Sequence, residues 1–204
     1  MNKKILLTCF EPFGGESINP SYEAVMNLSS PDGMELIKTV LPVEWGTSAE
    51  KLISIWEKTS PDAVIMTGLA GGADKIRIER VGINLCGAVK DNRGKYPSGE
   101  ESPCETPIDR AMPVAFFSTF DYASILRGLR AENIPATYSF SAGTYICNYV
   151  LFSALAKNHK DKGRIPIGFI HVPYSEAQGK AVFMKQADIT RAVGTAIINA
   201  FTGD

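Results

Sequence analysis

The chain has 204 residues, of which 45% are hydrophobic and 21% are charged, and its formal net charge is −1. This length suits one well-buried core better than two, and the composition is ordinary for a globular protein. A charge so close to zero gives no electrostatic basis for binding nucleic acid or an anionic membrane, and no apolar run is long enough to span a bilayer. We therefore expect neither as a partner.

The N-terminal segment and the cysteines predict a cytoplasmic protein. Residues 1–7 have a basic start but only a short apolar stretch, and they lack the cleavage pattern of a signal peptide. The four cysteines, Cys9, Cys86, Cys104 and Cys147, show none of the paired spacing that is typical of zinc sites. We therefore expect reduced thiols and no metal site.

Short runs rich in strand-forming residues alternate with helical patterns, which is typical of an α/β fold with a largely parallel sheet. The expected strands cover residues 4–9, 34–43, 62–67, 76–84, 136–139 and 165–172. Five helices are expected. The first follows residue 20, the second starts with a capping box of Thr47 and Glu50, and the third is capped by Asp121. The fourth contains Cys147, and the last has the buried stripe Ile189, Val193, Ile197 and Phe201.

Three connecting segments stand out between these elements. Residues 10–20 form a loop rich in Gly and Pro, residues 68–72 form another Gly-rich connection, and residues 85–112 form a long polar stretch. A connection as long as the last is usually functional or part of an assembly surface. Since the sequence contains no repeat, low-complexity segment or linker, we expect a single domain over residues 1–204.

Cys147 lies in the most informative run of the chain, Ser-Ala-Gly-Thr-Tyr-Ile-Cys-Asn-Tyr at residues 141–149. The run predicts a small-residue turn that opens into a helix, with the thiol on the first or second helical turn. Free backbone N–H groups and the positive end of the helix dipole favour a thiolate there. A cysteine in an apolar helix is most often an inert core residue, but the turn and the polar Asn148 favour an exposed helix start.

His171 is one of only two histidines, and it lies near the end of a predicted strand. A cysteine at a helix start and a histidine at a strand end suit nucleophilic acyl transfer. Such a histidine needs a third group to orient it, and Glu79 is the best candidate, because its charge in an apolar strand is costly to bury unpaired. The residues alone leave a core histidine open, and they favour a surface ion pair of Glu79 with Arg77 or Arg80.

Four motifs stand in order along the chain, after a first loop that reads Phe-Glu-Pro-Phe-Gly-Gly at residues 10–15. They are Glu79-Arg80-Val81 with Ile83-Asn84, Asp91-Asn92 with Gly94, Ser141-Ala142-Gly143 with Tyr145, Cys147 and Asn148, and Gly168-Phe169-Ile170-His171-Val172-Pro173-Tyr174. Over essentially its whole length, the chain resembles the pyroglutamyl peptidase I family, also called pyrrolidone-carboxylate peptidases. Each motif is a modest signal, but the ordered set is highly specific.

The resemblance implies a cysteine peptidase that removes an N-terminal pyroglutamyl residue, with peptides carrying that residue as its partners. Cys147 would be the nucleophile, His171 its base, and Glu79 the group that holds the imidazole. The fold implied is a single-domain α/β/α sandwich with a mostly parallel, twisted mixed sheet, similar to that of purine nucleoside phosphorylases and other hydrolase-like folds. The resemblance also implies a cytoplasmic homo-oligomer, commonly a tetramer, and no cofactor.

Pyroglutamate is a small neutral lactam without a free amine, so its site needs apolar walls and a few amide contacts. Phe10 and Phe13, in the first loop, can stack on the flat ring, although simple core packing would also explain two aromatic residues. The resemblance implies that these two positions line the pocket together with Asn19, Tyr145 and Ile146.

The chain departs from the family at two places, and three alternatives stay open. Leu69 stands where many members carry Gln, a position associated with substrate or oxyanion contacts. Ala88-Val89-Lys90 replaces an Arg-Ile-Pro run, in a segment one residue shorter. Both changes bear on catalytic efficiency more than on reaction type. The alternatives are a catalytically weakened pyroglutamyl-binding protein, a nucleoside-phosphorylase-like enzyme on the same fold, and a thiol enzyme that uses Cys86 or Cys104.

Overall fold

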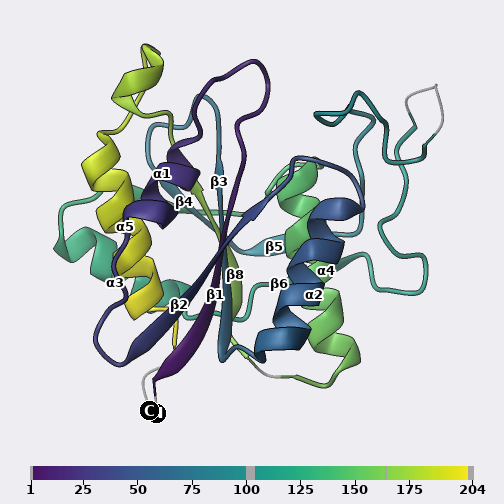
Figure 1. Ribbon diagram of the computed structural model, residues 1–204, viewed down its shortest axis with the longest axis horizontal. Helices are drawn as coiled ribbons and strands as arrows, with labels where there is room; N and C mark the ends of the chain where they lie inside the picture. The colour runs from purple at the N-terminus through teal and green to yellow at the C-terminus, as the bar shows by residue number, and fades with distance from the viewer. Residues whose placement is uncertain (1, 100–103, 164, 202–204) are drawn as a thin grey trace.

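A twisted six-stranded sheet forms the centre of the computed structural model, which describes residues 2–99, 104–163 and 165–201 (Figure 1). The strands lie in the order β2-β1-β3-β8-β4-β7, and every neighbouring pair is parallel except β4 and β8. Their bounds are β1 (Lys3–Phe10), β2 (Met34–Leu41), β3 (Ala63–Leu69), β4 (Ile76–Glu79), β7 (Ala136–Ser139) and β8 (Ile167–Val172). The predicted mixed, mostly parallel sheet is confirmed.

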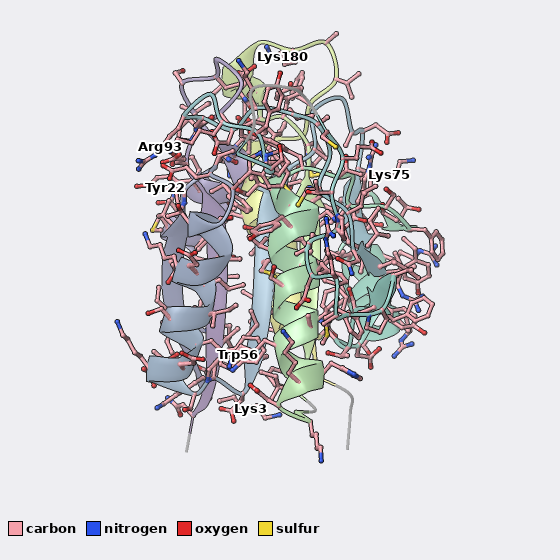
Figure 2. The ribbon with its side chains drawn as sticks, turned by 90° about the vertical axis from the view of Figure 1, so that its right-hand side faces the viewer. Lys3, Tyr22, Trp56, Lys75, Arg93 and Lys180 are labelled. Atoms are coloured by element: carbon pink, nitrogen blue, oxygen red, sulfur yellow. The ribbon has the colours of Figure 1, made fainter. Side chains whose placement is uncertain are left out.

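Helices cover both faces of this sheet, as the predicted α/β/α sandwich requires (Figure 1). One face carries α1 (Pro20–Asn27), α3 (Tyr122–Ala131) and α5 (Gln186–Ile198). The other carries α2 (Thr47–Thr59) and α4 (Ile146–Lys160), which lie side by side in Figure 2. Among the described residues, no helix combines the length and the apolar character that crossing a bilayer would require.

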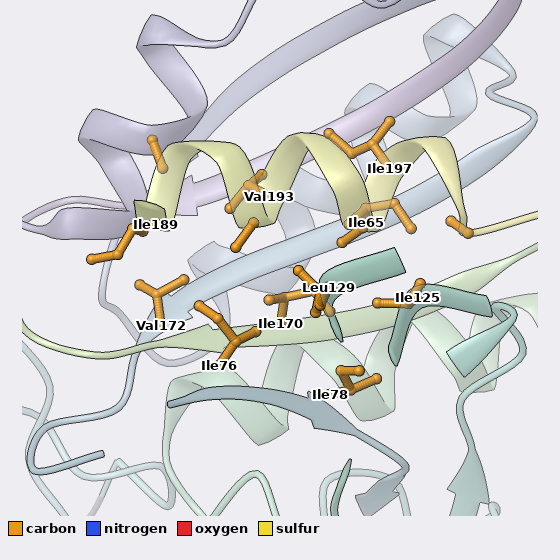
Figure 3. Packing of buried hydrophobic residues seen from close by; sticks show 14 of the residues in the cluster. Ile65, Ile76, Ile78, Ile125, Leu129, Ile170, Val172, Ile189, Val193 and Ile197 are labelled. Carbon is orange, nitrogen blue, oxygen red and sulfur yellow. The ribbon is translucent and has the colours of Figure 1, made fainter. Parts of the chain in front are cut away.

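The core on the first face is built from aliphatic side chains of α5 and of the sheet (Figure 3). Ile189, Val193 and Ile197 are fully buried at every fourth position of α5, and they face residues such as Ile65 and Ile170. Burying each such side chain contributes about 1.5–3 kcal/mol. The predicted stripe is confirmed up to Ile197, but Phe201 lies beyond the end of the helix and packs half-buried against the edge of this core.

The predicted strand over residues 76–84 is wrong as a single element, because the chain changes sheets at Arg80. β4 ends at Glu79, and β5 (Val81–Ile83) pairs with β6 (Ala115–Phe117) in a separate two-stranded antiparallel sheet. The Arg80 N–H donates to the Ser139 carbonyl at 2.8 Å, while its carbonyl accepts from the Ser118 N–H at 2.9 Å. Arg80 thus bonds on one side to β7 and on the other to the residue after β6.

The start of α2 and the end of β3 also differ from the sequence-based expectation. The capping box of Thr47 and Glu50 is wrong, because Gly46, with φ of 76°, takes the cap position of α2 and no side chain caps the helix. A positive φ is a conformation that glycine adopts readily. In addition, β3 extends to Leu69, so that Gly68 belongs to a buried strand and not to a loop.

Candidate active site

The candidate site lies where strands of the central sheet end and where α4 begins. In an open sheet of this kind, ligands bind beyond the carboxyl ends of the parallel strands. Phe10 is the last residue of β1, and His171 is the penultimate residue of β8. Cys147 is the second residue of α4, and Tyr145 is the N-cap residue of that helix.

Glu79 and His171 meet because β4 runs antiparallel to β8. Glu79 lies opposite Phe169, which is two residues from His171 on the same face of the sheet. His171 Nδ1 and Glu79 Oε1 are 2.8 Å apart, and Glu79 is fully buried. The favoured alternative of a surface ion pair between Glu79 and an arginine is therefore wrong. Glu79 Oε2 is also buried, and no hydrogen-bond partner is found for it among the described residues.

Cys147 completes the group from α4. Its sulfur lies against Gly68, the residue of β3 that pairs with His171, and the interaction of the Cys147 side chain with the imidazole raises the pKa of His171. Because Cys147 lies in the first helical turn, its backbone N–H has no carbonyl four residues earlier within the helix, and this N–H remains a donor for a ligand. The structure thus brings together the three predicted catalytic side chains.

Gly68 provides the space for the sulfur atom, a feature that the sequence analysis did not single out. A Cβ atom at this position would lie 3.1 Å from Cys147 Sγ and 2.8 Å from the ring of Phe169. Gly68 is also the residue of β3 that pairs with His171 in the sheet. The sequence places this glycine in a Gly-rich run, but only the long-range packing shows which atoms it accommodates.

The pKa of His171 is raised by its charged neighbours, whereas the pKa values of the two buried thiols, Cys9 and Cys86, are raised by burial. Burial lowers the pKa of His171, but Cys147 and Glu79 outweigh this effect and raise it to about 9. Burial raises the pKa of Cys9 to about 12 and that of Cys86 to about 11. Both of these thiols are therefore protonated at neutral pH, which argues against Cys86 as a nucleophile. Cys104 is exposed.

Three half-buried aromatic side chains, Phe13, Trp45 and Tyr145, form an aromatic wall that packs against the same core cluster as Cys147. The ring centres of Phe13 and Tyr145 are 6.5 Å apart, and Trp45 meets Tyr145 edge-on at 5.5 Å. The sequence analysis missed Trp45. The available signal was an aromatic residue shortly after the end of a parallel strand.

Three other predicted pocket residues belong to the packed interior. Phe10 is 2% exposed and its ring centre lies 6.4 Å from that of Phe169, while Ile146 is 1% exposed. Asn19 is equally buried; its Oδ1 caps α1 by accepting from the Ser21 N–H, and its Nδ2 donates to the carbonyl of Glu11. These residues hold the first loop and the start of α4 in place.

The two departures from the family pattern lie close to this site. Leu69 is buried at the end of β3, opposite Val172, and offers no polar side chain. In the shortened segment, backbone atoms contact the aromatic wall: the Trp45 Nε1–H donates to the Val89 carbonyl at 2.9 Å, and the Tyr145 hydroxyl donates to the Lys90 carbonyl at 3.1 Å.

No set of three metal-ligating side chains comes together among the described residues. The arrangement of Cys147, His171 and Glu79 instead provides a nucleophile, a proton carrier and a group that orients this carrier. A thiol beside an imidazole that is hydrogen-bonded to a carboxylate is an arrangement suited to nucleophilic acyl transfer.

Comparisons with known proteins agree in family and in fold. A family model described as pyroglutamyl peptidase matches residues 3–200. The pyrrolidone-carboxylate peptidase 1 of Caldanaerobacter subterraneus subsp. tengcongensis is 42% identical over 95% of this chain and 96% of its own length. The pyrrolidone-carboxylate peptidase of Thermococcus kodakarensis is 44% identical over 86% of this chain and 83% of its own.

Solved structures show the same similarity. The crystal structure of pyroglutamyl peptidase I from Bacillus amyloliquefaciens superposes with a TM-score of 0.90 at 33% identity, covering 98% of this chain and 95% of that one. A mutant pyrrolidone carboxyl peptidase from Pyrococcus furiosus gives a TM-score of 0.89 at 38% identity, with 97% of both chains covered.

Proposed function

The chain belongs to the pyroglutamyl peptidase family, and we propose that it hydrolyses the amide bond after an N-terminal pyroglutamyl residue, as a cysteine peptidase. The observation that carries this proposal is the position of His171: its Nδ1 lies 2.8 Å from Glu79 Oε1, and the neighbouring Cys147 side chain raises its pKa.

In the proposed mechanism, the Cys147 thiolate attacks the carbonyl carbon of the pyroglutamyl residue, and a carbon–sulfur bond forms. The Cys147 backbone N–H donates to the oxyanion. The His171 imidazolium then gives its proton to the departing amine nitrogen as the carbon–nitrogen bond breaks. Water attacks the resulting thioester while His171 accepts a proton from it, and pyroglutamate and the thiol are released. Glu79 keeps the imidazole oriented and stabilises its charged form.

We propose that the lactam ring lies against the aromatic wall, where Phe13 and Tyr145 present half-buried ring surface. Phe10, Asn19 and Ile146 complete the pocket from the interior side. A lactam has no ammonium group, so this pocket needs no carboxylate to bind its substrate, and apolar walls with a few amide contacts suffice.

We further propose that the chain acts as a single peptidase domain over residues 1–204, in the cytoplasm, as a homo-oligomer that is commonly a tetramer in this family. The four cysteines are all unpaired, which supports a reducing compartment.

The test compares three fluorogenic coumarin amides, of pyroglutamate, proline and glutamine, with and without a thiol-blocking reagent. We expect hydrolysis of the pyroglutamyl amide alone, and its loss after thiol blocking. Binding of pyroglutamate without any hydrolysis would overturn the proposed activity in favour of a weakened binding protein. Equal hydrolysis of the prolyl amide would overturn the proposed specificity.

A further inference from the structure

Three loops far apart in sequence surround the aromatic wall. The first loop (residues 11–19) carries Phe13, the second loop (residues 42–46) carries Trp45, and the third loop (residues 84–99) carries the carbonyls that accept from Trp45 and Tyr145. The geometry of the wall therefore depends on how these loops are held relative to one another. Loops without such links are the least stable parts of most domains.

Glu11 and Asn92 connect all three loops through a small set of hydrogen bonds. Glu11 Oε1 accepts from the Val43 N–H at 3.1 Å and from Asn92 Nδ2 at 3.1 Å. Asn92 Nδ2 also donates to the Pro12 carbonyl at 3.0 Å, so that both amide hydrogens are directed to the first loop. The Asn92 backbone N–H donates to the Val43 carbonyl at 3.0 Å.

Asp91 adds a second connection next to the first. Its Oδ2 accepts from the backbone N–H of Trp45 at 3.1 Å, and its Oδ1 accepts from the N–H groups of Arg93 and Lys95 at 2.9 Å each. Asp91 is only 8% exposed, so most of its hydrogen-bonding capacity is used within the protein. It therefore fixes the turn of the third loop and the backbone of Trp45 together.

We infer that Glu11, Asp91 and Asn92, here called the loop lock, are positioning residues for recognition of the pyroglutamyl ring. Asp91 and Asn92 directly follow Val89 and Lys90, whose carbonyls orient Trp45 and Tyr145. The loop lock thus sets the spacing between the ring of Phe13 and the other two rings. This inference rests on the proposed function, which it extends from the reacting groups to the residues that determine specificity.

Within the part of the chain that the structure describes, no hydrogen bond joins the loop lock to Cys147, His171 or Glu79. The hydrogen bonds of the loop lock end on loop residues, whereas the imidazole of His171 is held by Glu79. Loss of the lock should therefore weaken substrate binding and leave the chemical step and the reactivity of the thiol unchanged. Asn92 is exposed, so replacing its side chain creates no cavity in the core and does not endanger folding.

The test uses Asn92→Ala, with Glu11→Gln as the conservative variant that keeps an acceptor for Val43, and with Thr119→Val as a matched control. Thr119 also links two distant segments, through hydrogen bonds to Ile165 and Ile167, but at the start of β8 and away from the loop lock. The measurements are KM and kcat for a pyroglutamyl coumarin amide, the alkylation rate of Cys147 by iodoacetamide, and amide hydrogen exchange of the first and second loops.

For Asn92→Ala, we expect KM to rise about fivefold to tenfold, as the loss of two exposed hydrogen bonds implies. We expect kcat and alkylation to change little, and the first loop to lose exchange protection. Glu11→Gln should change KM less than Asn92→Ala, and Thr119→Val should leave KM and loop protection unchanged.

An unchanged KM in Asn92→Ala, or an equal rise of KM in Thr119→Val, would overturn the inference. If the unaltered protein hydrolysed no pyroglutamyl amide, the proposed function would fail. In that case hydrogen exchange alone would test whether the loop lock holds the first loop. Unchanged exchange protection of the first loop in Asn92→Ala would contradict that role.

Discussion

At the scale of single residues, the fully buried Glu79 carboxylate is the most costly group in the candidate site. A charge without solvent access is tolerated when it is paired, and the side-chain partner found for Glu79 is His171. Pairing with Glu79 therefore favours a positively charged imidazole, which the proposed mechanism needs when His171 donates its proton to the departing amine.

Replacing Glu79 by Gln keeps the size of the side chain but removes the charge that stabilises the imidazolium. We expect kcat for a pyroglutamyl amide to fall by about 10³-fold or more, while KM changes little, as with other orienting carboxylates of catalytic triads. Steady-state kinetics measures both parameters, and a melting curve controls for folding. A variant with kcat within threefold of the parent would rule out this role for Glu79.

The raised pKa of His171 predicts how stability and activity depend on pH. The pKa rises from 6.5 to about 9 in the folded protein, so this group contributes its full stabilisation below pH 6.5 and loses it as the pH rises through about 9. The free energy of unfolding should therefore fall over this window in the parent more than in His171→Gln. The value of kcat/KM should decline on the same alkaline side, because the imidazolium donates the proton to the leaving amine. Urea titrations at a series of pH values test the first point, and identical pH profiles for parent and variant would contradict it.

At the scale of elements, β3 affects the position of the thiol because it places Gly68 against Cys147 Sγ. A methyl group at residue 68 would meet both Sγ and the ring of Phe169, so Gly68→Ala should displace the sulfur from His171. We expect lower kcat and slower alkylation of Cys147, with a destabilisation of about 1–3 kcal/mol from overpacking.

Gly82→Ala is the matched control for this prediction. Its Cβ would be similarly crowded, at 3.1 Å from the Phe152 backbone nitrogen, but its nearest contacts do not include the thiol. It should lose stability and keep the alkylation rate of Cys147. Equal loss of thiol reactivity in the two variants would show that Gly68 has no special relation to the sulfur.

The elements also show what the sequence can and cannot predict. Alternation and apolar runs identify the strands and the Cys147 helix, because these signals are local. They do not show that β4 pairs antiparallel to β8, and this pairing is what brings Glu79 to His171. The residues alone favour a surface ion pair of Glu79, and only the resemblance to the family points to its contact with His171. Trp45 and the loop lock were missed for the same reason, since their roles arise from contacts between distant loops.

At the scale of the whole molecule, the proposed chemical step and the proposed substrate recognition are located on different parts of the structure, the packed scaffold and the loops. The sheet and α4 hold the proposed reacting groups, and sites on such elements are held more accurately than sites on loops. The loops hold the aromatic wall. The formal net charge of −1 gives the molecule no overall preference for charged peptides, which agrees with the proposal that discrimination comes from the ring pocket.

In the proposed mechanism, Cys147 carries the pyroglutamyl group as a thioester. Intact-mass spectrometry after rapid acid quenching of a reaction with a pyroglutamyl amide tests it most directly, followed by peptide mapping of the modified cysteine. We predict a mass increase of one pyroglutamyl group, located on Cys147 and absent from Cys147→Ala, which should also be inactive. An adduct on Cys86 or Cys104, or full hydrolysis by Cys147→Ala, would contradict the account.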